Sequence, residues 1–182
     1  MTLKSLEALG QFLIEYQSSF FDDMRVADYG GTDNIGGGLV RKLLETGDLK
    51  KYFMLDFDNG VDLREPIKGE KFDLGICMDL LEHTSNPFIV SKNIIDSLSP
   101  GSLLFVTVPF VWEIHAVPDD FWRFTHHGLM ELFKEMEVEK VYGVIDPIED
   151  DIKKGEEPVN PVAWYLPVSK PFTRIIGIFR KK

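Results

Sequence analysis

One stretch, residues 72–110, holds a complete strand–helix–strand unit and constrains the fold more than any other part of the chain. Phe72–Met78 forms a short apolar run of the kind that buried parallel strands show. Asn86 and Pro87 then supply an N-cap and a proline in the first helical turn, and apolar residues follow at helical spacing. Ser102–Val108 provides a second apolar strand. Two strands joined by a helix predict a parallel α/β sheet.

This unit also predicts where function resides. A parallel sheet binds ligands beyond the carboxyl ends of its strands. Met78–His83 (MDLLEH) follows the first strand of the unit, and Pro109 and Phe110 follow the second. We therefore expect these two segments to face one cleft.

The rest of the chain continues to alternate strands and helices, and we expect one domain over residues 1–182 with helices on both faces of the sheet. The further predicted strands are Arg25–Tyr29, Tyr52–Phe57, Val61–Leu63, Val138–Ile145 and Arg174–Phe179. Helices are predicted within residues 1–24, from Leu39 to near Gly47, and from Thr125 to Met136. Residues 146–172 are rich in Pro, Asp and Glu, which predicts a surface excursion.

Composition narrows the range of functions. With 44% hydrophobic residues the chain can build a core, and no run approaches the roughly 18 apolar residues of a membrane helix. A net charge of −10 disfavours a nucleic-acid substrate, because the protein repels phosphates. The N-terminal segment is amphipathic and unlike a signal peptide, and the single cysteine, Cys77, falls in a predicted buried strand. Both features favour a cytosolic setting.

A glycine-rich turn, residues 30–38, follows the first predicted strand. Glycine lets the backbone approach a ligand closely, although the segment also fits a flexible loop. Asp28 lies two positions before the first glycine, where a carboxylate repels a pyrophosphate but suits a ligand with a positive amino group. Asp56, at the end of the next strand, fits either a ribose diol or a surface position. Asp62 fits either an adenine amino group or a turn.

These motifs, in this order, resemble the class I S-adenosylmethionine-dependent methyltransferases of the small group called type 11. The matching elements are Asp28-Tyr29-Gly30, Asp56, Phe72-Asp73, Leu81-Glu82-His83, Asn86-Pro87, Ser99-Pro100-Gly101-Ser102, Val108-Pro109-Phe110 and the segment from His115 to Thr125 (HAVPDDFWRFT). The resemblance covers roughly residues 25–145. The chain departs from the family pattern at Thr32, where glycine is usual, and at Ser102, which replaces the second of two glycines.

The resemblance implies a Rossmann-like three-layer α/β sandwich with a mostly parallel, seven-stranded sheet and an antiparallel last strand. It also implies S-adenosylmethionine as the cofactor. The residues that it implies as cofactor contacts are Asp28, Tyr29, Gly30, Gly31, Asp56, Phe57, Asp62, Met78 and Asp79.

The candidate residues for an acceptor also follow predicted strand ends. His115 is either the catalytic general base, a role that suits an imidazole near neutral pH, or a histidine that holds its own loop. His83 and Arg123 are candidate substrate-binding residues. His83 also fits a role in fixing its turn, and Arg123 fits a pairing with the aspartates beside it. We expect Trp112 in an aromatic wall of the acceptor pocket.

The sequence thus predicts an enzyme that transfers a methyl group to an oxygen or nitrogen of a small molecule, a sugar or other metabolite. The alternative is a cofactor-binding or degenerate module without catalysis of its own. We predict no metal site, because the adjacent His126 and His127 point in different directions on a helix and make a poor chelate.

Overall fold

The structure, a computed structural model, describes residues 3–20, 23–31, 51–69, 71–115, 119–145 and 172–182. The strands in these residues are β1 (Arg25–Tyr29), β2 (Lys51–Leu55), β3 (Phe72–Met78), β4 (Leu98–Pro109), β5 (Glu137–Val144) and β6 (Arg174–Arg180). The helices are α1 (Leu3–Glu15), α3 (Pro87–Ser97) and α4 (His126–Leu132), with the 3-10 turns η1 (Gln17–Ser19) and η2 (Leu81–His83). These strands form one sheet in the order β2-β1-β3-β4-β6-β5.

The first four strands are parallel, and β6 runs antiparallel to both of its neighbours, β4 and β5. The sheet grows in two directions from β1, with β2 on one side and β3 on the other. Doubly wound sheets bind ligands at such a reversal of strand order, beyond the carboxyl ends of the strands. The fold therefore points to the ends of β1 and β3 as the place for a site.

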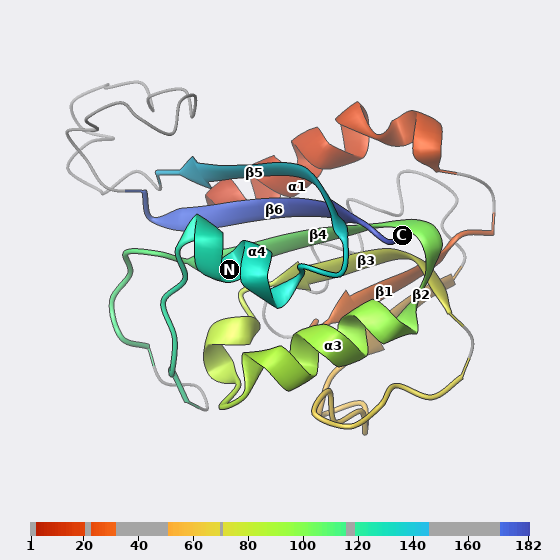
Figure 1. The fold of residues 1–182 in the computed structure, drawn as a ribbon, viewed down its shortest axis with the longest axis horizontal. Coiled ribbons are helices and arrows are strands. Elements are labelled where there is room, and N and C mark those ends of the chain that lie inside the picture. Colours follow the sequence, from red (N-terminus) through yellow and green to blue (C-terminus); the bar gives the residue numbers. More distant parts are fainter. Residues whose placement is uncertain (1–2, 21–22, 32–50, 70, 116–118, 146–171) are drawn as a thin grey trace.

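Helices cover both faces of the sheet, α1 on one face and α3 with α4 on the other (Figure 1). Alternate residues of a strand point to opposite faces, and the core divides accordingly. In β4, Leu103 and Phe105 pack on the α1 side, whereas Leu104 and Val106 pack on the α3 side. The described part of the chain is thus a three-layer α/β sandwich.

Most predicted elements are present. β1 and β3 have the predicted bounds, and α3 begins at Pro87 behind the predicted Asn86 cap, whose side chain accepts a hydrogen bond from the first turn. β4 begins at Leu98, earlier than predicted, because Leu98 already pairs with Phe72. The predicted elements that lie outside the described residues are the turn beyond residue 31, the helix from Leu39 and the excursion over residues 146–171.

The predicted strand over residues 61–63 is wrong, and the described sheet has six strands rather than the expected seven. These residues form turns whose polar groups bond locally. Val61 N donates to Asp56 O at 2.8 Å, and the Asp62 side chain accepts a hydrogen bond from Arg64 N at 3.0 Å. Local side-chain bonds of this kind offer the backbone an alternative to a sheet ladder.

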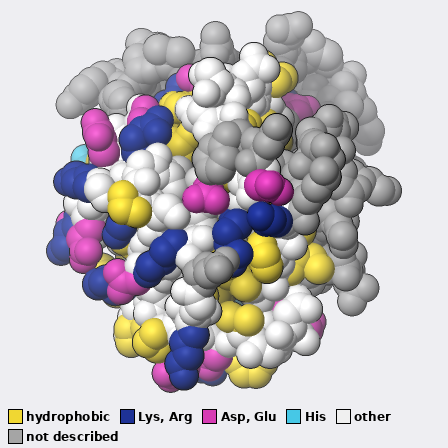
Figure 2. Space-filling model, turned by 90° about the vertical axis from the view of Figure 1, so that its right-hand side faces the viewer, with side chains coloured by type: hydrophobic (Ala, Val, Ile, Leu, Met, Phe, Trp, Pro, Cys, Tyr) yellow, Lys and Arg dark blue, Asp and Glu magenta, His cyan; other side chains and the backbone are white. Residues whose placement is uncertain are grey.

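The surface shown in Figure 2 carries side chains of both charges. None of the described helices has the length and apolar character that crossing a bilayer requires. At the end of the molecule where β6 ends, Lys and Arg side chains lie among Asp and Glu (Figure 2). The charges visible on that face therefore do not form a patch of one sign.

Crowding at the centre of the sheet generates a first prediction. Gly75 of β3 pairs with Ala27 on one side and Leu104 on the other. A Cβ atom on Gly75 would lie 2.7 Å from Leu104 Cδ1 and 3.0 Å from a ring carbon of Tyr29. We expect Gly75→Ala to lower the free energy of unfolding by about 1–3 kcal/mol through overpacking, as measured by urea denaturation.

Gly10→Ala is the matched control. Gly10 lies in α1, and a Cβ atom there meets no other atom within 4 Å. Alanine is the better helix former, so this variant should gain up to about 1 kcal/mol. A Gly75→Ala protein as stable as the control would contradict the crowding around β3.

Candidate functional site

A cleft of about 390 Å³ lies beyond the carboxyl ends of β1 and β3, where the strand order of the sheet reverses. Its walls come from the turns after β1, β2 and β3, from the start of α3 and from the segment before α4. The lining residues include Gly30, Asp56, Asp62, Leu80, His83 and Asp119.

Gly30 begins the turn after β1 with a φ of +76°, in the left-handed region that favours glycine. Its amide donates to Leu55 O at 2.9 Å and so fixes the turn against the end of β2. A Cβ atom on Gly30 would lie 2.7 Å from Leu80 Cδ1. Glycine therefore lets this turn approach the segment after β3, and it leaves bare backbone at the cleft.

Asp28, near the end of β1, has a buried side chain that is 3% exposed and accepts a hydrogen bond from the Tyr52 hydroxyl. Burial raises the pKa of Asp28 to about 7; the hydrogen bond from Tyr52 opposes this rise, and the charge of Asp56 adds to it. A Cβ atom on Gly31 would lie 2.3 Å from Asp28 Oδ2, so the carboxyl group lies directly against the glycine backbone. A positively charged ligand group beside Asp28 would favour the ionised form.

Asp56 follows the last residue of β2 and lines the cleft with a buried side chain. Its Oδ1 accepts hydrogen bonds from N and Nδ2 of Asn59, at 2.8 and 2.7 Å. Its Oδ2 is buried without a hydrogen-bond partner among the described residues. A buried carboxylate oxygen without a donor costs free energy, so this position favours a ligand hydroxyl.

The mouth of the cleft carries Asp62 and Phe57. The Asp62 carboxylate binds the Arg64 guanidinium, with Oδ1 2.9 Å from Nε and Oδ2 2.7 Å from Nη2. These hydrogen bonds lower the pKa of Asp62 to about 2. Phe57 is 72% exposed, and the Arg64 guanidinium lies 5.8 Å from its ring centre. The exposed ring offers an apolar surface against which a flat group can stack.

Two predicted cofactor residues turn their side chains away from the cleft. The Tyr29 hydroxyl shares a hydrogen bond of 2.6 Å with the Ser97 hydroxyl in the core beneath α3. Met78 packs against the core on the α1 side of the sheet. Alternation along the strands explains both positions, and only the backbone of these residues lies near the strand ends.

Asp79 ends up in a buried ion pair and not in the cleft wall. It has a positive φ of 50°, and its Oδ1 accepts hydrogen bonds from Arg174 Nη1 at 2.6 Å and from Thr107 Oγ1 at 2.8 Å. The Arg174 guanidinium also lies 4.8 Å from the ring centre of Trp112. Asp79 and Trp112 therefore support the strand ends behind the cleft, although the sequence suggested direct ligand contacts for both.

The Arg123 guanidinium donates its hydrogen bonds to residues of its own segment, which lies between β4 and α4. Its Nη2 binds the Asp120 carboxylate at 2.6 Å and the Glu113 carbonyl oxygen at 2.7 Å. Its Nε donates to the Trp112 carbonyl oxygen at 3.3 Å. The structure thus shows the pairing with a neighbouring aspartate that the sequence left open, and this pairing fixes the loop.

Hydrogen bonds from Phe121 and Trp122 tie this segment to the turn after β3. Phe121 N donates to the Glu82 carbonyl oxygen at 2.7 Å. The indole Nε1 of Trp122 donates to the Thr84 carbonyl oxygen at 2.8 Å. The loop that leaves β4 therefore returns to η2, although the residues are far apart in the sequence.

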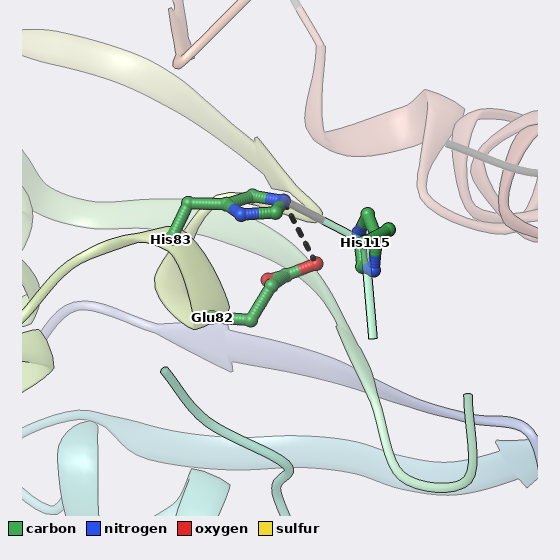
Figure 3. Close-up of side chains that lie close together, drawn as sticks. All are labelled: Glu82, His83 and His115. Carbon is green, nitrogen blue, oxygen red and sulfur yellow. Dashed lines mark ion pairs between the residues drawn. The ribbon is translucent and has the colours of Figure 1, made fainter. Parts of the chain in front are cut away.

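Glu82, His83 and His115 converge as a result, beside the cleft whose wall His83 helps to form (Figure 3). His83 Nδ1 donates to the Asp119 carbonyl oxygen at 2.6 Å, and His83 Nε2 lies 3.9 Å from Glu82 Oε1. The two imidazole rings meet edge to face, with 4.9 Å between their centres and 85° between their planes. The hydrogen bond from His83 Nδ1 to Asp119 also holds the turn that carries His83, which is one of the two roles that the sequence suggested for this residue.

Glu82 is the member of this group that the sequence analysis did not select. Its side chain is fully buried, and neither carboxylate oxygen has a hydrogen-bond partner among the described residues. Burial, together with the charge of Asp79, raises the pKa of Glu82 well above its usual range. Perturbed acids of this kind concentrate at functional sites. The one sequence signal was an acid within the run MDLLEH, directly after a buried strand.

No family model matches the chain, and no curated protein matches its sequence. Solved structures match at low identity. The N-methyltransferase NodS from Bradyrhizobium japonicum aligns with a TM-score of 0.64 at 12% identity, over 98% of this chain and 97% of that one. Magnesium protoporphyrin IX methyltransferase from Synechocystis PCC 6803, with bound SAH, aligns with a TM-score of 0.58 at 10% identity, over 98% and 83%. The [4+2]-cyclase SpnF aligns with a TM-score of 0.58 at 14% identity, over 96% and 82%.

These likenesses show the fold. The chain has a Rossmann-like methyltransferase fold, with a mixed six-stranded sheet in its described part. One fold serves several reactions, so the site has to carry the argument for function.

The buried carboxyl group of Asp28 generates a second prediction. The folded protein holds its proton up to a pKa of about 7, whereas the ordinary value is 3.8. The unfolded chain releases this proton near the ordinary value, so this group makes the protein less stable as the pH rises from about 4 to about 7. Asp28→Asn removes the titrating carboxyl group, so this variant does not lose stability in this way as the pH rises. We expect the variant to match the parent near pH 4 and to exceed its unfolding free energy by about 2–4 kcal/mol near pH 8.

Urea denaturation at the two pH values measures the difference. Asp58→Asn is the control, because Asp58 is exposed on the turn after β2 and should show no such pH-dependent gain. An Asp28→Asn protein whose stability follows that of the parent across this pH range would show that Asp28 is ionised in the folded state.

Proposed function

We propose that this chain is an S-adenosylmethionine-dependent methyltransferase that acts on an oxygen or nitrogen of a small molecule. The observation that carries the proposal is the cleft at the reversal of the sheet, which is lined both by a buried Asp56 oxygen without a donor among the described residues and by the bare backbone of Gly30. A carboxylate at the end of the second strand is suited to a ribose hydroxyl. The fold and the Asp56 carboxylate therefore both fit S-adenosylmethionine.

The residues at the cleft fit the cofactor in distinct ways. S-adenosylmethionine, when bound, supplies an electrophilic methyl group on a sulfonium sulfur. We assign Asp56 to the ribose, because its Oδ2 can accept from a hydroxyl while Asn59 occupies Oδ1. We assign Gly30 and Gly31 to the backbone wall, and Asp28 to the side of the positive amino group.

The other predicted cofactor residues receive lesser roles. Phe57 and Asp62 belong at the adenine end, one as a stacking surface and the other as an acceptor that it shares with Arg64. Tyr29 and Met78 contribute through the backbone of the strand ends. Asp79 contributes by holding the end of β3 through its buried ion pair.

The structural neighbours support the cofactor assignment. NodS is an N-methyltransferase, and one of its solved forms is a complex with S-adenosyl-L-homocysteine. The magnesium protoporphyrin IX methyltransferase also holds SAH. A shared fold together with a fitting carboxylate makes S-adenosylmethionine the cofactor that we propose for this chain.

The acceptor end of the cleft lies at His83 and the neighbouring His115. Methyl transfer requires that the acceptor be aligned with the methyl carbon and that water be excluded. His115 is the proposed catalytic residue, since its imidazole contacts His83 of the cleft wall. Arg123 and Trp112 act as positioning residues, because their contacts fix the segments around this end.

A small acceptor fits the dimensions and the charge. A cleft of about 390 Å³ falls within the range of small-molecule pockets, and a net charge of −10 disfavours nucleic acid. A sugar or other metabolite with a hydroxyl or amine is the proposed class of acceptor.

We place the protein in the cytosol as one domain. This placement agrees with the free thiol of Cys77, which is buried and whose pKa is raised by that burial.

Cofactor binding gives the third prediction. Calorimetric titration with S-adenosyl-L-homocysteine should show binding to the parent protein and no binding of NADH. We expect Asp56→Ala to weaken that binding by about 1–3 kcal/mol, because the variant removes a charged hydrogen-bond acceptor. The matched control is Asp58→Ala, two residues along the same turn, where the side chain is exposed and the affinity should not change.

Two results would argue against the proposal. Equal losses in the Asp56 and Asp58 variants would remove Asp56 from the ribose. Binding of S-adenosyl-L-homocysteine without methyl transfer to any hydroxyl or amine acceptor would favour a cofactor-binding module without catalysis.

A further inference from the structure

We infer that Glu82, His83 and His115 together bind a divalent transition-metal ion beside the cleft. The binding itself depends only on these side chains. The role that we give to the ion, holding a hydroxyl oxygen of the acceptor, rests on the proposed function. The sequence had predicted no metal site, because the adjacent His126 and His127 make a poor chelate. His83 and His115 lie 32 positions apart, and no spacing pattern links them.

The three side chains have the spacing of a chelate. One donor atom from each residue can be chosen so that all three lie within 4.8 Å of one another. His83 Nε2 and Glu82 Oε1 are already 3.9 Å apart. Donors of a tetrahedral ion with bonds near 2.1 Å lie about 3.4 Å apart, so small side-chain movements complete the site. Two imidazoles and one carboxylate suit zinc, cobalt, manganese or iron in the divalent state.

Glu82 gives an independent reason for a cation. Both of its oxygens are buried and lack a hydrogen-bond donor among the described residues, while its side chain points toward the two histidines (Figure 3). A buried carboxylate is normally paired, or it binds a metal ion. An ion between Glu82 and the imidazoles would supply the partner that the described protein atoms do not.

The outer hydrogen bonds leave the correct nitrogens available. His83 Nδ1 donates to the Asp119 carbonyl oxygen, so in the neutral ring Nε2 keeps its lone pair. His115 Nδ1 lies 3.2 Å from both Asp120 Oδ2 and the Glu113 carbonyl oxygen. Both neighbours are acceptors, so Nδ1 carries the hydrogen and Nε2 is left to bind.

This arrangement is the one that metal-binding histidines show in proteins, where the second ring nitrogen donates to a carbonyl or carboxylate. Asp120 is in turn held by Arg123, with Oδ2 2.6 Å from Nη2. Asp120 and Arg123 are therefore positioning residues for the His115 ring. The hydrogen bonds of Arg123 to its own segment would thus also hold the His115 ring in place for the ion.

Three protein ligands leave at least one coordination position open, as in catalytic metal sites. His83 lines the cleft, so an open position on its metal lies next to the space for an acceptor. A bound ion lowers the pKa of an oxygen ligand and so favours the deprotonated acceptor. With Nε2 on the ion, His115 is a ligand and not a free base, which replaces the single-base interpretation of this residue.

A cobalt titration tests the inference. The full chain is treated with EDTA, dialysed and titrated with Co²⁺, with the visible absorption bands of the bound ion as the signal. We expect one Co²⁺ per chain and displacement by Zn²⁺. Glu82→Gln and His115→Gln should each weaken binding by at least about 100-fold, and Asp120→Asn by about 10–100-fold through the His115 ring.

The chain offers a matched control in its other two histidines. A His126→Gln/His127→Gln double variant removes the remaining imidazoles and should bind Co²⁺ like the parent. Loss of the signal in this control with retention in Glu82→Gln would overturn the inference, as would the absence of Co²⁺ bands in the parent. Circular dichroism checks that each variant is folded. If Glu82→Gln does not fold, Asp120→Asn still tests the inference.

Calorimetry with S-adenosyl-L-homocysteine on the same samples separates the two proposals. Cofactor binding without Co²⁺ binding would overturn the metal site and leave the proposed function standing. Co²⁺ binding without cofactor binding would support the metal site and count against the methyltransferase.

Discussion

The site depends on the contact between the segment that leaves β4 and the turn that follows β3. Three hydrogen bonds make this contact: from Phe121 N to the Glu82 carbonyl oxygen, from the Trp122 indole to the Thr84 carbonyl oxygen, and from His83 Nδ1 to the Asp119 carbonyl oxygen. Arg123 stiffens the returning segment from within. Without this contact the cleft would lose a wall, His115 would have no fixed neighbour, and the Glu82 carboxylate would open to water. The group of Glu82, His83 and His115 beside the cleft thus depends on contacts between segments that are far apart in the sequence.

Three buried acids surround the same strand ends, and the fold carries their cost. Asp28 and Glu82 have raised pKa values because burial disfavours their charged forms, and Asp56 keeps one oxygen without a described donor. The central strands offset this cost, since β3 and β4 are buried along most of their length. A ligand that pairs with these acids binds the folded state selectively and stabilises it by mass action. Asp56 lines the cleft and Glu82 lies beside it, and the oxygens of these two acids that lack a described donor are easier to explain by binding than by folding.

The sequence predicted all six strands of the described sheet because apolar runs report burial directly. β1 and β3 were predicted with their observed bounds for that reason, and Asn86 and Pro87 marked the start of α3. The predicted strand at residues 61–63 failed because hydrogen bonds around Asp62 form turns, which apolar periodicity does not reveal. Five predicted site residues line the cleft, because their positions follow from strand ends: Gly30, Asp56, Phe57, Asp62 and His83. The burial of Glu82 and its meeting with His115 arise from contacts between distant segments, and no local pattern encodes them.

The fold does not decide the reaction, since its structural neighbours include both methyltransferases and a [4+2]-cyclase. The side chains beside the cleft bear more directly on the reaction. A role as general base would explain why His115 lies here, but it would leave both oxygens of the buried Glu82 without a described partner. It would also give no reason why the His83 ring binds the Asp119 carbonyl oxygen while the His115 ring lies 3.2 Å from the Asp120 carboxylate. A metal ion explains the carboxylate, the ring orientations and the bracing by Arg123 together, because each is a requirement of the same coordination sphere.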